Sequence, residues 1–544
     1  MRRRPATPLL LSATLVTLAA TLALGSTPGA AALGTQSAGT QSVGAQSSGA
    51  RLSSAPAGAG TDPDEALAAA RTALGLSDGA QSRGPGQPVG EGNEATMALR
   101  DLRVALPQLG AEQRREGEAL LARPTDGGDD PVGQGYHSRS KKLCSGNVCV
   151  HYVTKGADRP DSQKWVRKTL QVMNKVWDFE TGTLGYRKPV SDRSLPQGKN
   201  GGNGKFDVYL KELSGQRLYG YCAPEYLVKG NKRLANGYCV LDDDFAKAEY
   251  GRKPLDTLRV TAAHEFFHAI QFNYDYREDR WLLESTATWV EERFADDVND
   301  NRQYLPVGQV RVPDEPLDIF STTFGRHYGN WAWWEFLTQK YGGVIVRSVW
   351  KQAGQFKAAG RDYSTRALTK VLAGKGGFSR NYARFAAVNN NPAAFYPEGA
   401  SWPSAARIAN LKLSKDATRK SQATTVDHMS AQNVDVTPAA ELKDKAWTLR
   451  LTLDGPAAAT KPMAAVLVQN KTGAWDERLL GFNRKGRARL SVPFSARRVD
   501  AVTVSLVNTS TSFDCWEDQA YSCAGIADHD AAPFQVTAKA FKDK

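Results

Sequence analysis

The chain has 544 residues and a formal net charge of +13. This length exceeds one ordinary hydrophobic core, so we expect two or more domains. The basic residues are scattered and form no stripe interleaved with aromatic residues, which argues against nucleic acid as a partner.

The N-terminus has the pattern of a secretory signal peptide. Three arginines follow the first methionine, residues 9–24 are mainly apolar, and small residues occupy 29–32. We predict that residues 1–32 are a signal peptide cleaved after Ala32, which makes the protein secreted and extracellular. The apolar run is short and interrupted by polar residues, and no later run is as long, so we expect no membrane span.

Residues 33–135 change from low complexity to helical periodicity. Residues 34–60 are rich in Gly, Ala, Ser and Gln, a composition that cannot bury a core and that we expect to be disordered. Residues 62–76 and 94–122 show the Ala/Leu spacing of helices. We interpret 33–135 as a pro-region that would keep the protein inactive until export, or alternatively as a passive N-terminal extension.

Two strand signals precede the most informative part of the chain. Residues 205–210 alternate between apolar and polar side chains, and residues 237–241 form a second short strand. Asp242, Asp243 and Asp244 follow directly. Their hard oxygen atoms could bind Ca²⁺. The alternative, which we favour, is a turn with negative charge at the start of a helix.

Residues 264–268 read His-Glu-Phe-Phe-His. Two histidines four residues apart on a helix project from one face, so both imidazoles can bind one ion. Apolar residues recur at helical spacing and predict a buried amphipathic helix: Val260, Ala263, Phe267 and Ile270. Buried histidines are costly unless a partner satisfies them, and a metal ion does so. The alternative is a helix whose histidines face solvent or form local hydrogen bonds.

Glu284 follows the second histidine by sixteen residues, within Trp-Leu-Leu-Glu-Ser-Thr-Ala-Thr-Trp. This pattern predicts a second buried helix with its carboxylate turned inward. His264, His268 and Glu284 would then provide three ligands for one Zn²⁺ per chain and leave a tetrahedral position open for water. Glu265 could accept a proton from that water.

Other carboxylates compete for the role of third ligand: Asp275, Asp279, Glu291 and Glu292. Glu291 lies two helical turns after Glu284, on about the same face. It could accept the distal N–H of a histidine ligand. An ordinary solvated carboxylate is the alternative.

The HEFFHAIQ sequence that begins at His264, followed by the W-x-x-E-x-x-A sequence that begins at Trp281, resembles the gluzincin branch of the zincin metallopeptidases. It is more closely similar to a group of secreted bacterial metalloproteases that carry the HEFFHAIQ helix. The resemblance implies a zincin-like α+β catalytic domain over residues 136–415. It also implies zinc ligation by the two histidines and Glu284, and a general base at Glu265.

The same resemblance suggests further site residues. Gluzincin aminopeptidases place a catalytic tyrosine just before a glycine at the start of a helix, which matches Tyr328 and makes His327 the second candidate. Either side chain could stabilise an oxyanion, although plain packing is the alternative for Tyr328. In zincins an edge strand pairs with the substrate, and residues 237–241 are expected to be that strand. The spacing from His268 to the third ligand is shorter than in the best-known gluzincins, so exopeptidase activity does not carry over.

The pattern of apolar residues in the C-terminal part has a different period. Residues 416–430 are polar and linker-like, and from residue 431 the pattern changes to a period of two. Six short strands separated by turn residues predict an all-β sandwich over 431–544: 447–453, 464–468, 478–482, 488–492, 499–506 and 534–540. Such a domain could contact the cell wall or another polymer, or could stabilise the catalytic domain.

The six cysteines fall into three close pairs. Export predicts disulfides, and local spacing favours three bonds: Cys144–Cys149, Cys222–Cys239 and Cys515–Cys523. No C-x-x-C doublet occurs, so we do not expect a cysteine metal site.

These features predict a monomeric, secreted zinc metallopeptidase, preferably an endopeptidase, that acts on polypeptides. One alternative is a secreted surface- or polymer-binding protein with a catalytically inactive zincin unit. Another is hydrolysis of a non-peptide amide in the cell wall. Glu265 favours an enzyme, because a structural zinc site does not need a general base.

Overall fold

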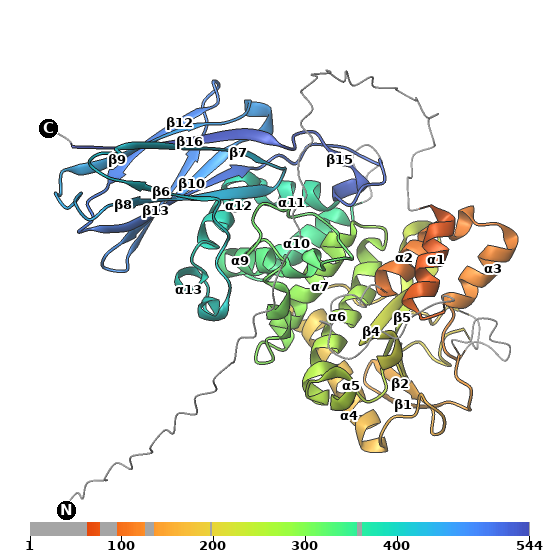
Figure 1. Cartoon of the computed structure of the whole chain (residues 1–544). Coiled ribbons are helices and arrows are strands. Elements are labelled where there is room, and N and C mark those ends of the chain that lie inside the picture. The colour runs from red at the N-terminus through yellow and green to blue at the C-terminus, as the bar shows by residue number, and fades with distance from the viewer. Residues whose placement is uncertain (1–61, 77–94, 126–134, 196–198, 356–361, 543–544) are drawn as a thin grey trace, which may run out of the picture. The chain divides into compact units, whose positions relative to one another are not determined.

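The computed structural model describes five stretches of the chain: residues 62–76, 95–125, 135–195, 199–355 and 362–542. All of them belong to one compact unit, residues 55–544. The predicted signal peptide and the low-complexity stretch 34–60 lie outside the described residues. An α+β part is followed by a β-rich part (Figure 1). In the stretches described, no helix has the length and apolar character needed to span a bilayer.

Three helices come first: α1 (Pro63–Ala73), α2 (Ala95–Ala105) and α3 (Ala111–Leu120). The Asp62 carboxylate caps α1 by accepting the N–H groups of Asp64 and Glu65. The helical stretch predicted over 94–122 contains α2 and α3, and the chain breaks between them at Pro107 and Gly110. Proline lacks an N–H and glycine favours non-helical backbone, so the break has a local cause.

The α+β part contains one mixed sheet with strand order β1-β2-β3-β5-β4. Its strands are β1 (Lys141–Ser145), β2 (Val148–Tyr152), β3 (Phe206–Lys211), β4 (Gly220–Val228) and β5 (Asn231–Asp242). The expectation that residues 237–241 form the edge strand is wrong: they lie in β5, between β3 and β4. The edge strand beside β5 is β4, antiparallel to it, and β1 is the edge on the opposite side of the sheet. Pro224 in β4 obscures the strand in the sequence, but an edge strand tolerates proline.

Helices cover both faces of this sheet, because alternate residues of each strand point to opposite sides. Val208, Leu210 and Leu241 pack into the main core with α4 (Gln163–Trp177) and α6 (Pro254–Asp275). Tyr209, Tyr221, Tyr238 and Val240 pack on the other side, against leucines of α1, α2 and α3. The N-terminal helices are therefore a layer of the fold.

Further helices follow the sheet. They are α5 (Lys247–Tyr250), α7 (Arg280–Phe294), α8 (Arg326–Gly329), α9 (Trp331–Tyr341), α10 (Val344–Ala353), α11 (Ser364–Ala373), α12 (Phe378–Val388) and α13 (Pro392–Phe395). Short 3-10 or π turns occupy Leu106–Gln108, Asp178–Thr183, Ser214–Gln216, Asp300–Tyr304, Gly399–Ser401, Ala458–Thr460 and Ser522–Ala524. Tryptophans of α7, α9 and α10 are fully buried and fill the core around α6.

The C-terminal part is a sandwich of two sheets, ordered β11-β10-β13-β8-β6 and β12-β9-β16-β7 (Figure 1). Its strands are β6 (Ala409–Leu413), β7 (Arg419–Val426), β8 (Ser430–Pro438), β9 (Trp447–Asp454), β10 (Met463–Asn470), β11 (Trp475–Gly481), β12 (Arg487–Pro493), β13 (Val499–Asn508) and β16 (Ala532–Lys542). The pair β14 (Phe513–Asp514) and β15 (Ile526–Ala527) lies apart from both sheets. Apolar side chains from both sheets share one core.

Two boundaries predicted for this part are wrong. The β-rich part begins at β6, earlier than residue 431, and residues 416–430 include β7 instead of forming a linker. The strand β7 pairs only with β16 and exposes most of its polar side chains. An edge strand of this kind has the composition of a linker, so the sequence pattern could not separate the two.

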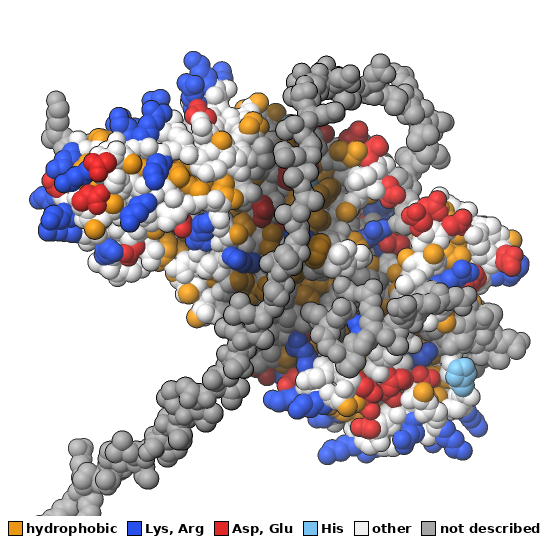
Figure 2. All heavy atoms as spheres, in the orientation of Figure 1, with side chains coloured by type: hydrophobic (Ala, Val, Ile, Leu, Met, Phe, Trp, Pro, Cys, Tyr) orange, Lys and Arg blue, Asp and Glu red, His pale blue; other side chains and the backbone are white. Residues whose placement is uncertain are grey.

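The three disulfides join the cysteines as local spacing predicts. Cys144–Cys149 links β1 to β2, and Cys222–Cys239 links β4 to β5. Cys515–Cys523 closes a loop between β13 and β16. Figure 2 shows Lys and Arg spread over the visible face, with no single basic stripe.

Candidate metal centre

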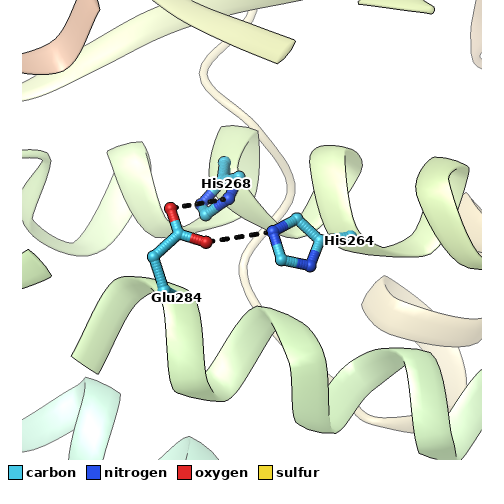
Figure 3. A group of neighbouring side chains, drawn as sticks. All are labelled: His264, His268 and Glu284. Carbon is cyan, nitrogen blue, oxygen red and sulfur yellow. Dashed lines mark hydrogen bonds and ion pairs between the residues drawn. The ribbon is translucent and has the colours of Figure 1, made fainter. Parts of the chain in front are cut away.

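Two neighbouring helices carry the predicted ligands. His264 and His268 lie four residues apart on α6, and Glu284 lies on α7. Phe266, Phe267 and Ile270 bury the opposite sides of α6 in the main core. A short turn joins the helices, so α7 packs back against α6 and turns Glu284 toward the histidines (Figure 3).

The three side chains converge on one point. His264 Nε2 lies 3.1 Å from Glu284 Oε2, and His268 Nε2 lies 3.6 Å from Glu284 Oε1. One ligand atom from each residue lies within 4.8 Å of the others. Tetrahedral zinc with bonds near 2.1 Å separates its ligand atoms by about 3.4 Å. The spacing therefore fits a Zn²⁺ ion.

Two buried atoms at this point lack ordinary partners. The side chains of His268 and Glu284 are 1% and 0% exposed. Within the described stretches, neither His268 Nε2 nor Glu284 Oε1 has a hydrogen-bond partner. Leaving such atoms unsatisfied is costly, and a metal ion would satisfy both.

The three side chains differ in protonation. Burial lowers the pKa of His268 to about 4, which keeps its imidazole neutral. Burial alone would raise the pKa of Glu284, but the charges of His268 and His264 outweigh it and hold this pKa below its ordinary value. Burial would lower the pKa of His264, but hydrogen bonds and charges of Glu284 and Glu291 raise it well above 6.5. An ionised Glu284 carboxylate thus faces a neutral His268 and a protonated His264. Metal binding at this point would displace the proton of His264, since a ligating imidazole must be deprotonated.

The Nδ1 atom of each histidine, on the side of the ring away from Glu284, contacts an oxygen acceptor. His264 Nδ1 lies 2.6 Å from Glu291 Oε1, the position expected for an outer acceptor. His268 Nδ1 lies 2.7 Å from Gln271 Oε1. The Gln271 amide group donates to Leu283 O and Thr286 Oγ1, which fixes its orientation. These contacts turn both Nε2 atoms toward Glu284.

Gln271 was given no role from the sequence, although a signal was present. It follows His268 by three residues, so it shares a helix face with that histidine. It is also a polar side chain that is 0% exposed, within an apolar run. The competing carboxylates are engaged elsewhere: Asp275 pairs with Arg233, Asp279 accepts the Cys523 N–H, and Glu292 accepts from Asn301.

Glu265 lies beside the ligands and opens onto a small pocket. Residues from α6, α7 and α8 line this pocket, among them His264, Glu265 and Tyr328. Burial raises the pKa of Glu265 to about 7, although the charge of His264 opposes the shift. A carboxylate with a pKa near neutrality can both accept and return a proton.

Tyr328 and His327 lie on α8 and are buried. The Tyr328 ring centroid lies 6.1 Å from that of His264, and Tyr304 packs 5.0 Å from Tyr328. His327 stacks on Phe320, and its Nδ1 accepts the Ser321 N–H at 3.3 Å. Tyr328 thus shares the pocket with Glu265, and His327 lies beside Tyr328 with ring centroids 4.2 Å apart.

The three aspartates after β5 form a turn. Asp242 accepts hydrogen bonds from the N–H groups of Asp244, Phe245 and Leu213 and from the Tyr250 hydroxyl. Four bonds already engage its carboxylate, although oxygen atoms of Asp242, Asp243 and Asp244 lie close enough together to hold an ion. The contacts favour the turn interpretation over Ca²⁺.

The structure thus gathers seven predicted residues into one region: His264, Glu265, His268, Glu284, Glu291, His327 and Tyr328. No protein-family model and no curated protein sequence matches the chain. The case for a metal centre therefore rests on the residues and their geometry.

Proposed function

We propose that the protein is a secreted zinc peptidase, preferably an endopeptidase, whose α+β part has a zincin-like fold. The observation that carries the proposal is the convergence of two imidazoles and a carboxylate, with His268 Nε2 and Glu284 Oε1 unsatisfied among the described residues. Glu265 beside this point provides a base where catalysis requires one.

The residues of the site divide the chemistry among them. Bound Zn²⁺ would polarise the scissile carbonyl and acidify water. Glu265 accepts a proton from the attacking water and delivers it to the leaving amine, as its pKa of about 7 allows. The Tyr328 hydroxyl, with His327 as the second candidate, donates to the oxygen on which negative charge develops. The edge strand β4 provides main-chain groups that hold an extended polypeptide.

The proposal also includes where the protein acts and what it contacts. Three disulfides and the N-terminal sequence pattern support an extracellular protein. We further propose that the protein acts as a monomer. The sandwich could contact cell wall or another polymer, and its hydrogen bonds to the α+β part also support a stabilising role.

Two other functions are alternatives to a peptidase: a surface-binding protein and a hydrolase of non-peptide amides. A surface-binding protein with an inactive metal unit would not need a buried acid beside the ligands, and Glu265 is 7% exposed. Hydrolysis of a non-peptide amide would use the same residues, so only substrates distinguish it.

The test combines metal analysis with digestion of casein and a quenched fluorescent peptide library. Glu265→Gln should keep about one zinc per chain and lose roughly a thousandfold in turnover, as expected for a missing general base. Glu441→Gln, at an exposed position of the sandwich, is the matched control. Full activity in the zinc-loaded Glu265→Gln protein would remove Glu265 from the mechanism. Zinc without cleavage, in the full chain and in the α2 variants below, would favour the binding function.

A further inference from the structure

The N-terminal helix α2 contacts Glu265, the proposed general base. Thr96, in the first turn of α2, is 2% exposed. Its hydroxyl donates to Glu265 Oε2 at 3.0 Å and accepts the backbone N–H of Cys222 at 2.9 Å. Cys222 belongs to β4, the edge strand. One hydroxyl therefore occupies both the carboxylate of the base and an N–H of the free sheet edge.

A substrate would need the same two groups. An extended peptide at a sheet edge pairs with the N–H and C=O groups of that edge. A general base must contact the water whose proton it takes. With Thr96 in place, Glu265 Oε2 and the Cys222 N–H are both engaged. Because α2 is helical, its backbone is not extended, so it fills the site without presenting an extended peptide bond for cleavage.

Further contacts fasten α2 to the helices that hold the ligands. Met97 is 1% exposed and packs into the main core that includes α6. The Arg100 guanidinium donates to Tyr276 O and Glu278 O, both at 2.8 Å. These carbonyls lie in the turn between α6 and α7, the helices that carry His264, His268 and Glu284.

Beyond α2 lies a cavity of about 520 Å³. Arg100, Asp101 and Val104 of α2 form part of its wall, opposite residues 319–323 and 516–521. Phe320, also in the wall, stacks on His327 of the candidate site. Withdrawal of α2 would remove this wall and widen the cavity.

Simple packing accounts for only one face of α2. Leu99 and Leu102 join the layer against Tyr221 and Tyr238, as a structural helix would. That role does not require a hydroxyl between the general base and the sheet edge. We propose that α2 is an autoinhibitory segment: Thr96 blocks Glu265 and the edge of β4, and the site opens when the first turn of α2 withdraws. The inference rests on the proposed peptidase function.

The test compares variants at Thr96 in the full chain. Thr96→Val removes the hydroxyl at nearly constant size and should raise kcat/KM for a fluorescent peptide about tenfold, the change expected for losing a hydrogen bond to an ionised group. Thr96→Ser keeps the hydroxyl and should remain inhibited. Thr72→Val is the matched control, because the Thr72 hydroxyl bonds only to Ala68 O of its own helix α1.

Hydrogen exchange provides a readout that needs no turnover. The Cys222 amide should exchange faster in Thr96→Val than in the wild type, because its acceptor is gone. Arg100→Ala, which releases α2 at its other anchor, should accelerate exchange in the first turn of α2 and also raise activity. If Thr96→Val fails to fold, Arg100→Ala still tests the same inference.

The outcomes separate the inhibition from the peptidase function. A wild-type chain as active as both variants would overturn the inhibition and leave the peptidase intact. Faster exchange at α2 and Cys222 with no gain in activity, in protein that cleaves peptides, would also overturn it. Zinc-loaded variants with α2 released that cleave no substrate would contradict the peptidase proposal itself.

Discussion

The clusters around His268 and His428 both combine a buried histidine with carboxylates, and they differ in one respect. In the first, His268 Nε2 and Glu284 Oε1 point toward a common space without hydrogen-bond partners among the described residues. In the second, His428 Nδ1 lies 2.6 Å from Asp530 Oδ1 and His428 Nε2 lies 3.0 Å from Asp318 Oδ1. Both imidazoles are buried, but of these two clusters only the first has atoms that a further ligand could satisfy.

The comparison shows that burial and charge alone do not identify a metal site. Both nitrogens of His428 donate to carboxylates, so this ring is a satisfied imidazolium that joins the α+β part to the sandwich. Burial would lower the pKa of His428, but Asp318 and Asp530 raise it to about 10. Metal binding instead requires neutral imidazoles with lone pairs aimed at one point, as at His268.

The largest expected effect is the loss of zinc. His268→Ala should lower zinc affinity by more than about a hundredfold and abolish cleavage, because two protein ligands do not complete the site. Excess zinc at about a thousand times its Kd should stabilise the wild type by roughly 4 kcal/mol, an effect absent in His268→Ala. Metal analysis and thermal melts with and without a chelator measure both.

His428→Gln is the contrasting variant. It should keep about one zinc per chain, since His428 belongs to the satisfied cluster. Zinc loss in His428→Gln equal to that in His268→Ala would remove the distinction between the clusters.

The second effect is pH-dependent stability from His428. Its folded pKa of about 10 exceeds the ordinary value of 6.5. Its contribution is therefore complete below pH 6.5, declines as the pH rises and is lost above about 10. His428→Gln should lower the free energy of unfolding by about 3 kcal/mol at pH 6, because Asp318 loses a buried partner. Urea unfolding from pH 6 to pH 10 should show this difference shrinking.

His137→Gln is the control for the pH series. His137 is exposed and should leave the stability curve unchanged. A difference between wild type and His428→Gln that grows with pH would contradict the assignment of a charged, paired ring.

The third effect concerns the acceptor behind His268. Gln271→Leu should weaken zinc binding about tenfold to a hundredfold, because the Nδ1–H loses the oxygen that fixes its tautomer. Gln271→Glu keeps an acceptor and should retain tighter binding than Gln271→Leu. Competition with a fluorescent chelator ranks the three proteins, and equal affinities would show that Gln271 only packs.

The smallest effect is expected at Tyr328. Tyr328→Phe should lower kcat about tenfold and leave zinc content unchanged, because the ring stays while the donor to the oxyanion is lost. Tyr304→Phe, the neighbouring ring in the pocket, is the comparison variant. Unchanged kcat in zinc-loaded Tyr328→Phe would assign the tyrosine to packing.

Local patterns predicted much of the metal cluster and little of what surrounds it. Helical spacing placed His264 and His268 on one face, and the three disulfides followed from short separations. Thr96 contacts Glu265 across 169 residues, and His428 contacts Asp318 across 110. Such pairs depend on the complete fold, and no period in the sequence encodes them. The edge strand β4 was missed for a local reason, its proline.

The loop closed by Cys515–Cys523 reaches back to the start of α7. The Cys523 N–H donates to Asp279 at 2.8 Å, and the Ser522 N–H donates to Asp318 at 2.9 Å. Asp279 is the residue from which α7, the helix of Glu284, begins. The sandwich is therefore not a detachable module. A fragment cut before β6 would leave Asp279 with the Ser364 hydroxyl but without the Cys523 N–H, and would remove both His428 and Ser522 from the buried Asp318. The intact protein should melt in one cooperative transition.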